Sequence, residues 1–260
     1  MQSTSGKTVL ITGASSGIGL GLTQRFAAHG WQVAALARRT TPIEALRANH
    51  PNLAPLILAI ECDVTDRKSV HQAVTTCTST FSSIDVAIAN AGVSLASPAT
   101  EMDAEIFEKT LAVNVMGAVY LFEALIPQMK VAKSGQLVGI SSLAAYRGLP
   151  QAGAYCASKA ALSALMESMR IDLAPVGIGV TCIHPGFIKT PLTDKNRYWM
   201  PFLMPLERGV DHIFKAIMRK KTNHAFPIPL STVTKSLRFW PDHVYRILIA
   251  SRRNEKVETQ

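Results

Sequence analysis

Tyr155 and Lys159 stand four residues apart in a run of helix-forming residues, so both side chains leave the same face of one helix. A phenol with an ordinary pKa of about 10 is a poor acid–base catalyst at neutral pH. A cation about 4 Å away favours the ionised phenol by roughly 4 kcal/mol at an effective dielectric constant near 20. The pair therefore predicts a tyrosine that transfers protons. The alternative is a packed tyrosine beside a lysine that reaches water.

An apolar run at 8–12 leads into a glycine-rich turn and then into apolar residues at helical spacing. This pattern predicts strand, turn and helix, with Gly30 as the helix C-cap. Glycines let a backbone approach a pyrophosphate, and the N–H groups at a helix N-terminus bind its negative charge. The Gly-x3-Gly-x-Gly spacing departs from Gly-x-Gly-x2-Gly, and no lysine follows as in a triphosphate loop. We expect a dinucleotide site; a purely structural turn is the alternative.

Taken together, Thr12-Gly-x3-Gly-Ile-Gly19, Asn90-Ala-Gly92, Asn114, Ser142, Tyr155-x3-Lys159 and Pro185-Gly186 resemble the short-chain dehydrogenase/reductase family. The resemblance runs from residue 8 to about 190, and the Ser-x12-Tyr-x3-Lys interval is highly specific for the family. It implies a catalytic set consisting of Asn114, Ser142, Tyr155 and Lys159. The cofactor-binding set that it implies is Gly13, Ser15, Ser16, Gly17, Ile18, Gly19, Arg38, Arg39, Asp63, Val64, Asn90, Ala91, Gly92, Tyr155, Lys159, Pro185, Gly186, Ile188 and Thr190.

The resemblance also implies a role for each group. Asp63 and Val64 should hold the adenine and Asn90 the adenosine side, while Ile188 and Thr190 contact the nicotinamide amide and the phosphates. Lys159 should hold the ribose hydroxyls of the nicotinamide and lower the pKa of Tyr155, and Asn114 should position a water that links this lysine to solvent. Family members associate through two long helices, here about 104–129 and 154–175, so a homodimer or homotetramer is expected.

The chain of 260 residues, 48% of them apolar, is long enough for one α/β domain spanning 1–260. Expected strands lie near 7–12, 32–37, 56–62, 84–89, 136–141, 179–184 and 224–228. Helical patterns separate them, including one that Thr65 caps and one over 104–129. Strict β–α alternation predicts a Rossmann-type three-layer sandwich with a seven-stranded, doubly wound parallel sheet. Ligands of such sheets bind beyond the carboxyl ends of the strands, where the motifs fall.

Cofactor choice is expected to be set after the second strand, where Ala37 is followed by Arg38 and Arg39. An acidic residue there binds a free ribose 2′-hydroxyl, whereas arginine accommodates a 2′-phosphate. Arg38 offers a bidentate fork to a phosphate. We therefore predict NADP(H) as the cofactor; a solvated basic loop is the alternative.

These residues predict hydride transfer between NADPH and a ketone or aldehyde, or the corresponding alcohol. Tyr155 would supply the proton, and Ser142 would hydrogen-bond the carbonyl oxygen on which negative charge develops. Ser141 is the rival, but strand alternation directs it the opposite way. Two other classes stay open: a catalytically silent NADP(H)-binding sensor or scaffold, and a non-redox enzyme on the same fold, such as an epimerase or dehydratase.

The region 187–222 is expected to form a substrate-binding lid, because prolines there discourage a long helix. Its aromatic residues and methionines, including Tyr198, Trp199 and Met204, could cover a hydrophobic substrate. Packing onto the domain is the alternative. Position alone makes Ser94, Leu143, Arg147 and Leu149 candidate wall residues.

Residues 207–260 hold 11 Lys and Arg against 5 Asp and Glu, much of the net charge of +9. The basic tail 236–260, with an expected helix at 242–253, could make peripheral contact with an anionic membrane; a solvated helix or a subunit contact is the alternative. No nucleic-acid-reading motif accompanies the charge, so no nucleic-acid partner is expected. The four scattered cysteines fit no metal pattern, and no metal is expected. Without a leader or an 18-residue apolar run, a cytoplasmic location is expected.

Overall fold

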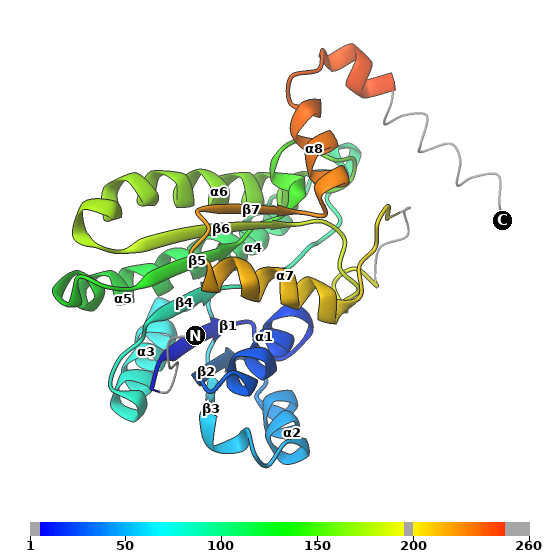
Figure 1. Cartoon of the computed structure of the whole chain (residues 1–260). Coiled ribbons are helices and arrows are strands. Elements are labelled where there is room, and N and C mark those ends of the chain that lie inside the picture. Colours follow the sequence, from blue (N-terminus) through cyan, green and yellow to red (C-terminus); the bar gives the residue numbers. More distant parts are fainter. Residues whose placement is uncertain (1–5, 195–199, 248–260) are drawn as a thin grey trace.

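The computed structural model describes residues 6–194 and 200–247. Seven parallel strands form one twisted sheet in the order β3-β2-β1-β4-β5-β6-β7 (Figure 1). Their bounds are β1 Thr8–Thr12, β2 Gln32–Ala37, β3 Ile57–Glu61, β4 Val86–Ala89, β5 Gln136–Ile140, β6 Gly179–Pro185 and β7 Asn223–Phe226. The predicted seven-stranded, doubly wound parallel sheet is confirmed, and each strand begins and ends within two residues of the expected position.

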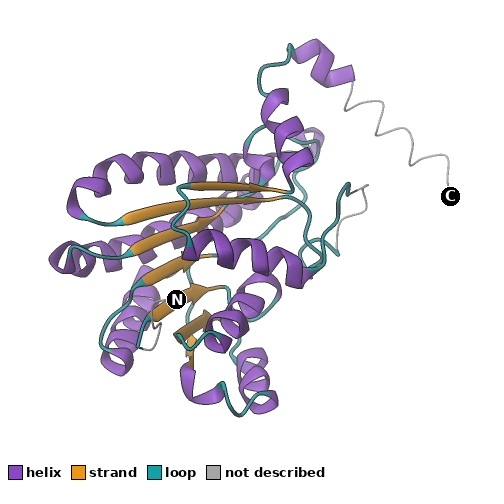
Figure 2. Cartoon of the chain, viewed as in Figure 1, coloured by secondary structure: helices purple, strands orange, loops and turns teal. Residues whose placement is uncertain are grey.

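Helices cover both faces of the sheet, so the strands bury side chains on both sides (Figure 2). On one face Val9 and Ile11 pack with α1 (Gly17–Ala28), α2 (Thr41–Asn49) and α7 (Leu206–Met218). On the other face Leu10 packs with α3 (Arg67–Phe81), α5 (Gly117–Ala132) and α6 (Gly153–Leu173). Successive side chains of a strand point to opposite faces. A continuous apolar strand therefore serves two cores, which is the expected three-layer sandwich.

The helix expected over 104–129 is interrupted. It consists of α4 (Ala104–Leu111), a π-helical turn at Ala112–Met116 and α5, which continues to residue 132. The expectation of one regular helix was therefore wrong in its middle. A π turn adds one residue to a helical turn, and here the turn contains the buried side chain of Asn114.

The stretch 104–132 is the one helical run in the described residues that is long and apolar enough to cross a membrane. In this fold it is a core element, because Leu121, Phe122 and Leu125 are buried against the sheet and its neighbouring helices. Core helices of this kind meet the same length and hydropathy test.

The N-cap expected at Thr65 is wrong by one residue. Asp66 caps α3 by accepting a hydrogen bond from the N–H of Lys68 at 2.9 Å. Both the N–H and the hydroxyl of Thr65 donate instead to Asp63 Oδ1. Because both residues are good caps, the sequence alone did not decide between them.

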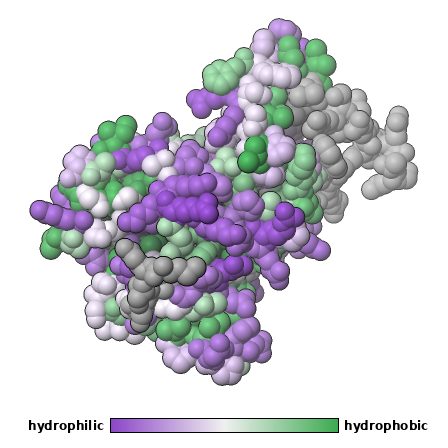
Figure 3. Space-filling model, viewed as in Figure 1, coloured by the Kyte–Doolittle hydropathy of each residue, from purple (hydrophilic) through white to green (hydrophobic). Residues whose placement is uncertain are grey.

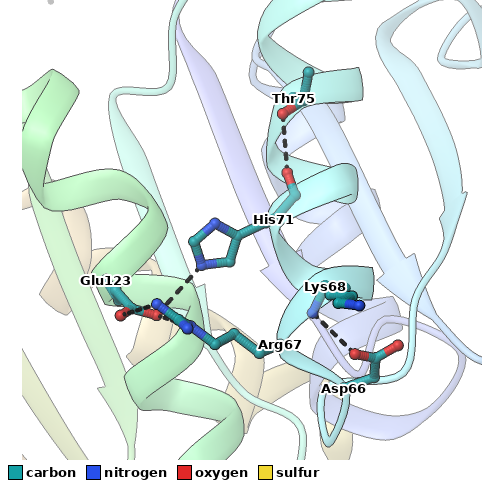
Figure 4. Close-up of polar contacts among 6 residues, drawn as sticks. All are labelled: Asp66, Arg67, Lys68, His71, Thr75 and Glu123. Atoms are coloured by element: carbon teal, nitrogen blue, oxygen red, sulfur yellow. Dashed lines mark hydrogen bonds and ion pairs between the residues drawn. The ribbon is translucent and has the colours of Figure 1, made fainter.

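An ion-pair cluster joins α3 to α5 (Figure 4). Arg67 donates through Nε and Nη2 to the two carboxylate oxygens of Glu123, each at 2.7 Å, and His71 Nε2 lies 3.3 Å from Oε2. The bidentate geometry gives this contact direction. It sets how the two helices align at the surface, although exposed pairs of this kind add little stability.

The segment 187–222, expected to be a lid, does not form one unit. Residues 206–218 are helix α7, in which Val210 and Ile213 are buried in the core beside α1. Backbone hydrogen bonds from Met204 to Phe187 and from Lys189 to Met204 close a loop before this helix. A lid function is thus restricted to residues before 206 and stays a prediction. Tyr198 and Trp199 lie outside the described residues.

We expect Gly19→Ala to lower the free energy of unfolding by about 1–3 kcal/mol, as overpacking does. A Cβ on Gly19 would lie 2.3 Å from the carbonyl oxygen of Gly13 and 2.6 Å from Asn90 Nδ2. This clash outweighs the helix propensity gained with alanine. Urea unfolding of both proteins measures the change. Gly148→Ala is the control, because a Cβ there meets nothing within 4 Å. Equal stability of the two variants would contradict the clash.

Candidate active site

A cleft of about 440 Å³ opens where the sheet's strands end at their carboxyl termini. Its volume is in the range of small-molecule sites. Every residue of the predicted catalytic and cofactor-binding sets lines the cleft except Gly19 and Asn114. The lining members are Gly13, Ser15, Ser16, Gly17, Ile18, Arg38, Arg39, Asp63, Val64, Asn90, Ala91, Gly92, Ser142, Tyr155, Lys159, Pro185, Gly186, Ile188 and Thr190.

Tyr155 and Lys159 both face this cleft from α6, as their spacing predicted. The ammonium Nζ of Lys159 lies 5.8 Å from the centroid of the Tyr155 ring and donates to the carbonyl oxygen of Ile140 at 2.8 Å. Only 4% of Lys159 is exposed. Burial disfavours the charged form and lowers the pKa of Lys159 to about 8. The lysine is thus still mostly cationic at neutral pH, but it loses its charge as the pH rises through about 8.

The two rival serines have different surroundings. Ser141 is buried, and its hydroxyl hydrogen-bonds the carbonyl of Lys159 at 3.0 Å and the hydroxyl of Ser163 at 2.7 Å. Ser142 is half-buried in the cleft, where its Oγ accepts the N–H of Ala144 at 3.1 Å. Ser142 keeps its O–H free to donate in this arrangement. Ser141 instead holds the backbone of α6.

Asn114 lies behind the cleft, with 1% of its surface exposed. Its Oδ1 accepts the N–H of Val93 at 2.8 Å, while Nδ2 donates to the Val93 carbonyl at 3.0 Å and to Ser158 Oγ at 2.9 Å. Ser158 in turn donates to the carbonyl of Tyr155. Asn114 therefore ties the loop after β4 to the helix that carries Tyr155. Its expected role with a water stays a prediction.

The glycine turn packs closely against the segments around it and leaves N–H groups at the start of α1 without a capping side chain. Gly13 and Gly17 have φ values of +65° and +51°, which favour glycine, and a Cβ on Gly13 would lie 2.7 Å from Ala91 Cα. The N-cap residue Ser16 makes no side-chain capping hydrogen bond. The first N–H groups of α1 are therefore not satisfied by the cap side chain, as an anion site requires. These features fit a pyrophosphate.

Asn90 and Thr12 hold this turn against β4. Asn90 Nδ2 donates to the carbonyls of Thr12 at 2.9 Å and Gly13 at 3.2 Å. Thr12 Oγ1 accepts the N–H groups of Asn90 and Ala91. Gly19, which does not line the cleft, packs against the same turn. Gly13 and Asn90 thus line the cleft, while Gly19 supports the same turn from outside the cleft.

The part of the cleft that follows β2 and β3 carries both signs of charge. Arg38 and Arg39 are exposed and follow Ala37, which lines the cleft where an acidic residue could have stood. The backbone N–H of Thr65 is the main reason that the pKa of Asp63 lies below its ordinary value, and the charge of Arg38 acts in the same direction. Asp63 is therefore ionised and already engaged with Thr65.

Sequence reasoning missed several lining residues: Cys62, Val93, Val113, Ile140, Pro191, Leu192 and Thr193. Each lies within three residues of a predicted site residue, so nearness in the sequence to those residues was the available signal. None of the four suggested wall residues, Ser94, Leu143, Arg147 and Leu149, lines this cleft. The side chain of Arg147 contacts the C-terminal segment instead.

All four cysteines are buried and unpaired. Burial raises the pKa of each thiol, to about 12 for Cys77 and about 11 for Cys182. Cys156, next to Tyr155, is included, so its neighbourhood does not activate it.

The profile of the "short chain dehydrogenase" family matches residues 7–201, three quarters of the chain. The chain belongs to the short-chain dehydrogenase/reductase family. This short-chain dehydrogenase/reductase is 38% identical to an "Uncharacterized oxidoreductase" of Myxococcus xanthus over 94% of its own length and 97% of the relative's. It is 36% identical to a "Farnesol dehydrogenase" of Aedes aegypti over 75% and 83%. Its family makes it an oxidoreductase of the dehydrogenase/reductase type.

Two solved members of the family share the fold of this short-chain dehydrogenase/reductase. One from Burkholderia phymatum, in complex with NAD, superimposes with a TM-score of 0.82 at 20% identity over 90% of this chain and 94% of that chain. One from Sphingobium yanoikuyae, in complex with NADPH, gives 0.77 at 24% over 98% and 96%. Nicotinamide dinucleotides of both kinds therefore bind to this fold.

We predict that the buried amine of Lys159 makes the cofactor-free protein more stable as the pH rises from 8 to 10. The folded pKa of about 8 lies below the ordinary 10.5, so the unfolded chain binds more protons in this window. The free energy of unfolding of the native protein, minus that of Lys159→Met, should grow by about 2 kcal/mol over the window. Denaturant titrations at both pH values measure it, and a constant difference would contradict the burial effect.

Proposed function

We propose that this protein is an NADP(H)-dependent oxidoreductase that reduces hydrophobic ketones or aldehydes with NADPH, or oxidises the corresponding alcohols with NADP+, with Tyr155 as the general acid and base. The observation that carries the proposal is the convergence of Ser142, Tyr155 and Lys159 in one cleft with the glycine turn. A protein that only binds a dinucleotide has no need of these three groups together. A sensor or scaffold role, or non-redox chemistry, is therefore the weaker alternative.

The reduced nicotinamide supplies a hydride to the carbonyl carbon when it is bound. Negative charge then develops on the carbonyl oxygen, which needs hydrogen-bond donors and a proton. In the proposed mechanism Ser142 donates to this oxygen and orients it, and Tyr155 transfers its phenolic proton. The cationic ammonium of Lys159 stabilises the phenolate that remains. Ser141 and Asn114 act indirectly, by holding α6 in place.

The proposed preference for NADPH rests on Arg38 and Arg39. Both line the cleft after β2, and the residue before them is Ala37 rather than an acid. An arginine fork suits a 2′-phosphate, whereas the acid that would bind a free 2′-hydroxyl is missing at this position. We assign the adenine to Asp63 and Val64, and the nicotinamide amide and phosphates to Ile188 and Thr190.

The preference for a hydrophobic substrate is supported by apolar side chains near the cleft. Leu192 lines it, and Phe202 and Leu203 are exposed in the loop that precedes α7. One relative is named for farnesol, a long apolar alcohol. We also propose that a homodimer or homotetramer forms through α5 and α6, where Met116, Val131 and Ile171 expose apolar surface nearby. The cytoplasmic location stays a prediction.

Tyr155→Phe should reduce turnover of a good ketone by at least about a hundredfold, because the proton donor is lost. Binding of NADPH should persist, since the ring is kept. Initial rates of NADPH oxidation, followed by absorbance of the reduced nicotinamide, measure turnover, and fluorescence titration measures binding. The control is Tyr120→Phe, a half-buried tyrosine of α5 that does not line the cleft. Near-normal turnover in Tyr155→Phe would remove the acid–base assignment.

Arg38→Ala should lower kcat/KM for NADPH about ten- to a hundredfold and leave kcat/KM for NADH nearly unchanged, because a charge-assisted hydrogen bond to the 2′-phosphate is lost. Steady-state kinetics with both cofactors give the ratio. Arg47→Ala is the matched control, because Arg47 lies on α2 outside the cleft and pairs with Glu44. Equal use of NADH and NADPH by the native protein would refute the cofactor assignment.

A further inference from the structure

The C-terminal part of the described chain exposes an unusual amount of apolar surface. Five of the fifteen large hydrophobic side chains exposed in the described residues lie between residues 228 and 247. They are Ile228, Val233, Phe239, Trp240 and Ile247. Figure 3 shows hydrophobic residues among hydrophilic ones on the segment 228–247, which projects from the body of the protein. We call these five residues and the cations among them the C-terminal face.

Helix α8 (Ile228–Leu237) carries both buried and exposed apolar side chains. Leu237 is buried, while Ile228 and Val233 are exposed. Phe239 follows the helix and is 85% exposed. A surface helix normally buries its apolar stripe and presents polar residues to water. Here Ile228 and Val233 are exposed to water, which leaves them available to a partner.

The charge of the C-terminal face favours an anionic partner. Lys235, Arg238 and Arg246 are exposed among the apolar residues. The single acid between 228 and 247, Asp242, is paired with Arg147 at 2.6 Å. Cations interleaved with exposed Phe and Trp are the composition of segments that lie in the interface of an anionic bilayer. Tryptophan in particular prefers that interface, because its ring is apolar and its N–H is polar.

The side-chain contacts of Arg147, which we call the Arg147 latch, connect the C-terminal face to the loop that follows β5 and contains Ser142. Arg147, five residues after Ser142, donates to the carbonyl of Arg238 and to Asp242, and its guanidinium lies 4.5 Å from the centroid of the Tyr245 ring. Tyr245 donates through its hydroxyl to the carbonyl of Gly148. The C-terminal face thus has a defined position relative to the active site.

The start of α8 also borders the cleft. A Cβ on Gly186, which lines the cleft, would lie 3.1 Å from both Pro227 and Leu230. The exposed Phe202 and Leu203 belong to the loop that precedes α7. A surface that rests on the C-terminal face would therefore lie close to the entrance used by a substrate.

We propose that the C-terminal face docks on anionic lipid bilayers, and that the enzyme takes its hydrophobic carbonyl substrate from the bilayer through the adjacent cleft. The substrate part of this inference rests on the proposed function; the docking part does not. The apolar residues enter the interface, the cations Lys235, Arg238 and Arg246 face the lipid phosphates, and the Arg147 latch holds the cleft at the membrane surface.

The test of docking is cosedimentation of the full chain with vesicles of phosphatidylcholine alone and with about 30% phosphatidylglycerol. We expect the protein to bind the anionic vesicles more tightly than vesicles of phosphatidylcholine alone, and we expect salt to weaken the binding to the anionic vesicles. The double variant Phe239→Ser, Trp240→Ser should bind at least about tenfold more weakly, because it loses the two aromatic side chains that enter the bilayer interface when the protein is bound. The control is Met102→Ser, Met218→Ser, which removes two exposed apolar residues that lie outside the C-terminal face, outside α5 and α6, and outside the cleft. It should bind like the native protein.

Three outcomes would overturn docking: no binding by the native protein, equal binding to neutral and anionic vesicles, or equal binding by both double variants. Sedimentation velocity supplies a further one. Suppose that the native protein does not bind vesicles, and that the variant Phe239→Ser, Trp240→Ser forms a smaller assembly than the native protein. A second copy of the chain then covers this face instead.

Delivery is tested separately with two ketones. Anionic vesicles should raise the rate with a long-chain 2-alkanone several-fold in the native protein but not in Phe239→Ser, Trp240→Ser, and a short water-soluble ketone should be reduced equally by both. In Arg147→Ala vesicle binding should persist while the rate increase is lost, because the latch positions the cleft. Vesicle binding without any rate increase would overturn delivery. Failure to reduce either ketone would refute the proposed function and leave the docking result standing.

Discussion

The candidate site depends on an ammonium group kept out of water. Moving a charged amine into a protein interior is costly unless it meets hydrogen-bond partners. Here Nζ of Lys159 donates to the last carbonyl of β5, at Ile140. The next residue, Ser141, holds the carbonyl of Lys159 itself. Strand and helix are thereby fixed to each other at two points. Of the proposed reacting groups, Ser142 follows Ser141 directly, and Tyr155 lies about one helical turn before Lys159.

The fold followed from the sequence because its main signals are local and repeated. Apolar runs such as 8–12 and 136–140 alternate with helical patterns, and only a doubly covered parallel sheet buries both sides of such strands. The site followed for a related reason. Parallel strands place their carboxyl ends at one edge, so Gly13, Asn90 and Ser142, far apart in the chain, had to meet there.

What could not be predicted depends on contacts between distant side chains. The π turn at Ala112–Met116 contains Asn114, whose amide bonds join it to Val93 and Ser158. Arg147 looked like a wall of the substrate site, but Asp242, 95 residues later, draws it to the C-terminal segment. The choice of Asp66 over Thr65 as a cap was also open, because either residue type serves. Periodicity carries no information about such pairings.

The burial of all four cysteines has a practical consequence for physical studies of this enzyme. Thiolates are the species that react with maleimides and similar reagents, and none of the native thiols, from Cys62 to Cys182, is both accessible and acidic. A single cysteine engineered on the exterior would therefore carry a fluorophore or spin probe alone, without prior removal of the natural ones. Fluorescence and distance spectroscopy on an otherwise unaltered chain become straightforward.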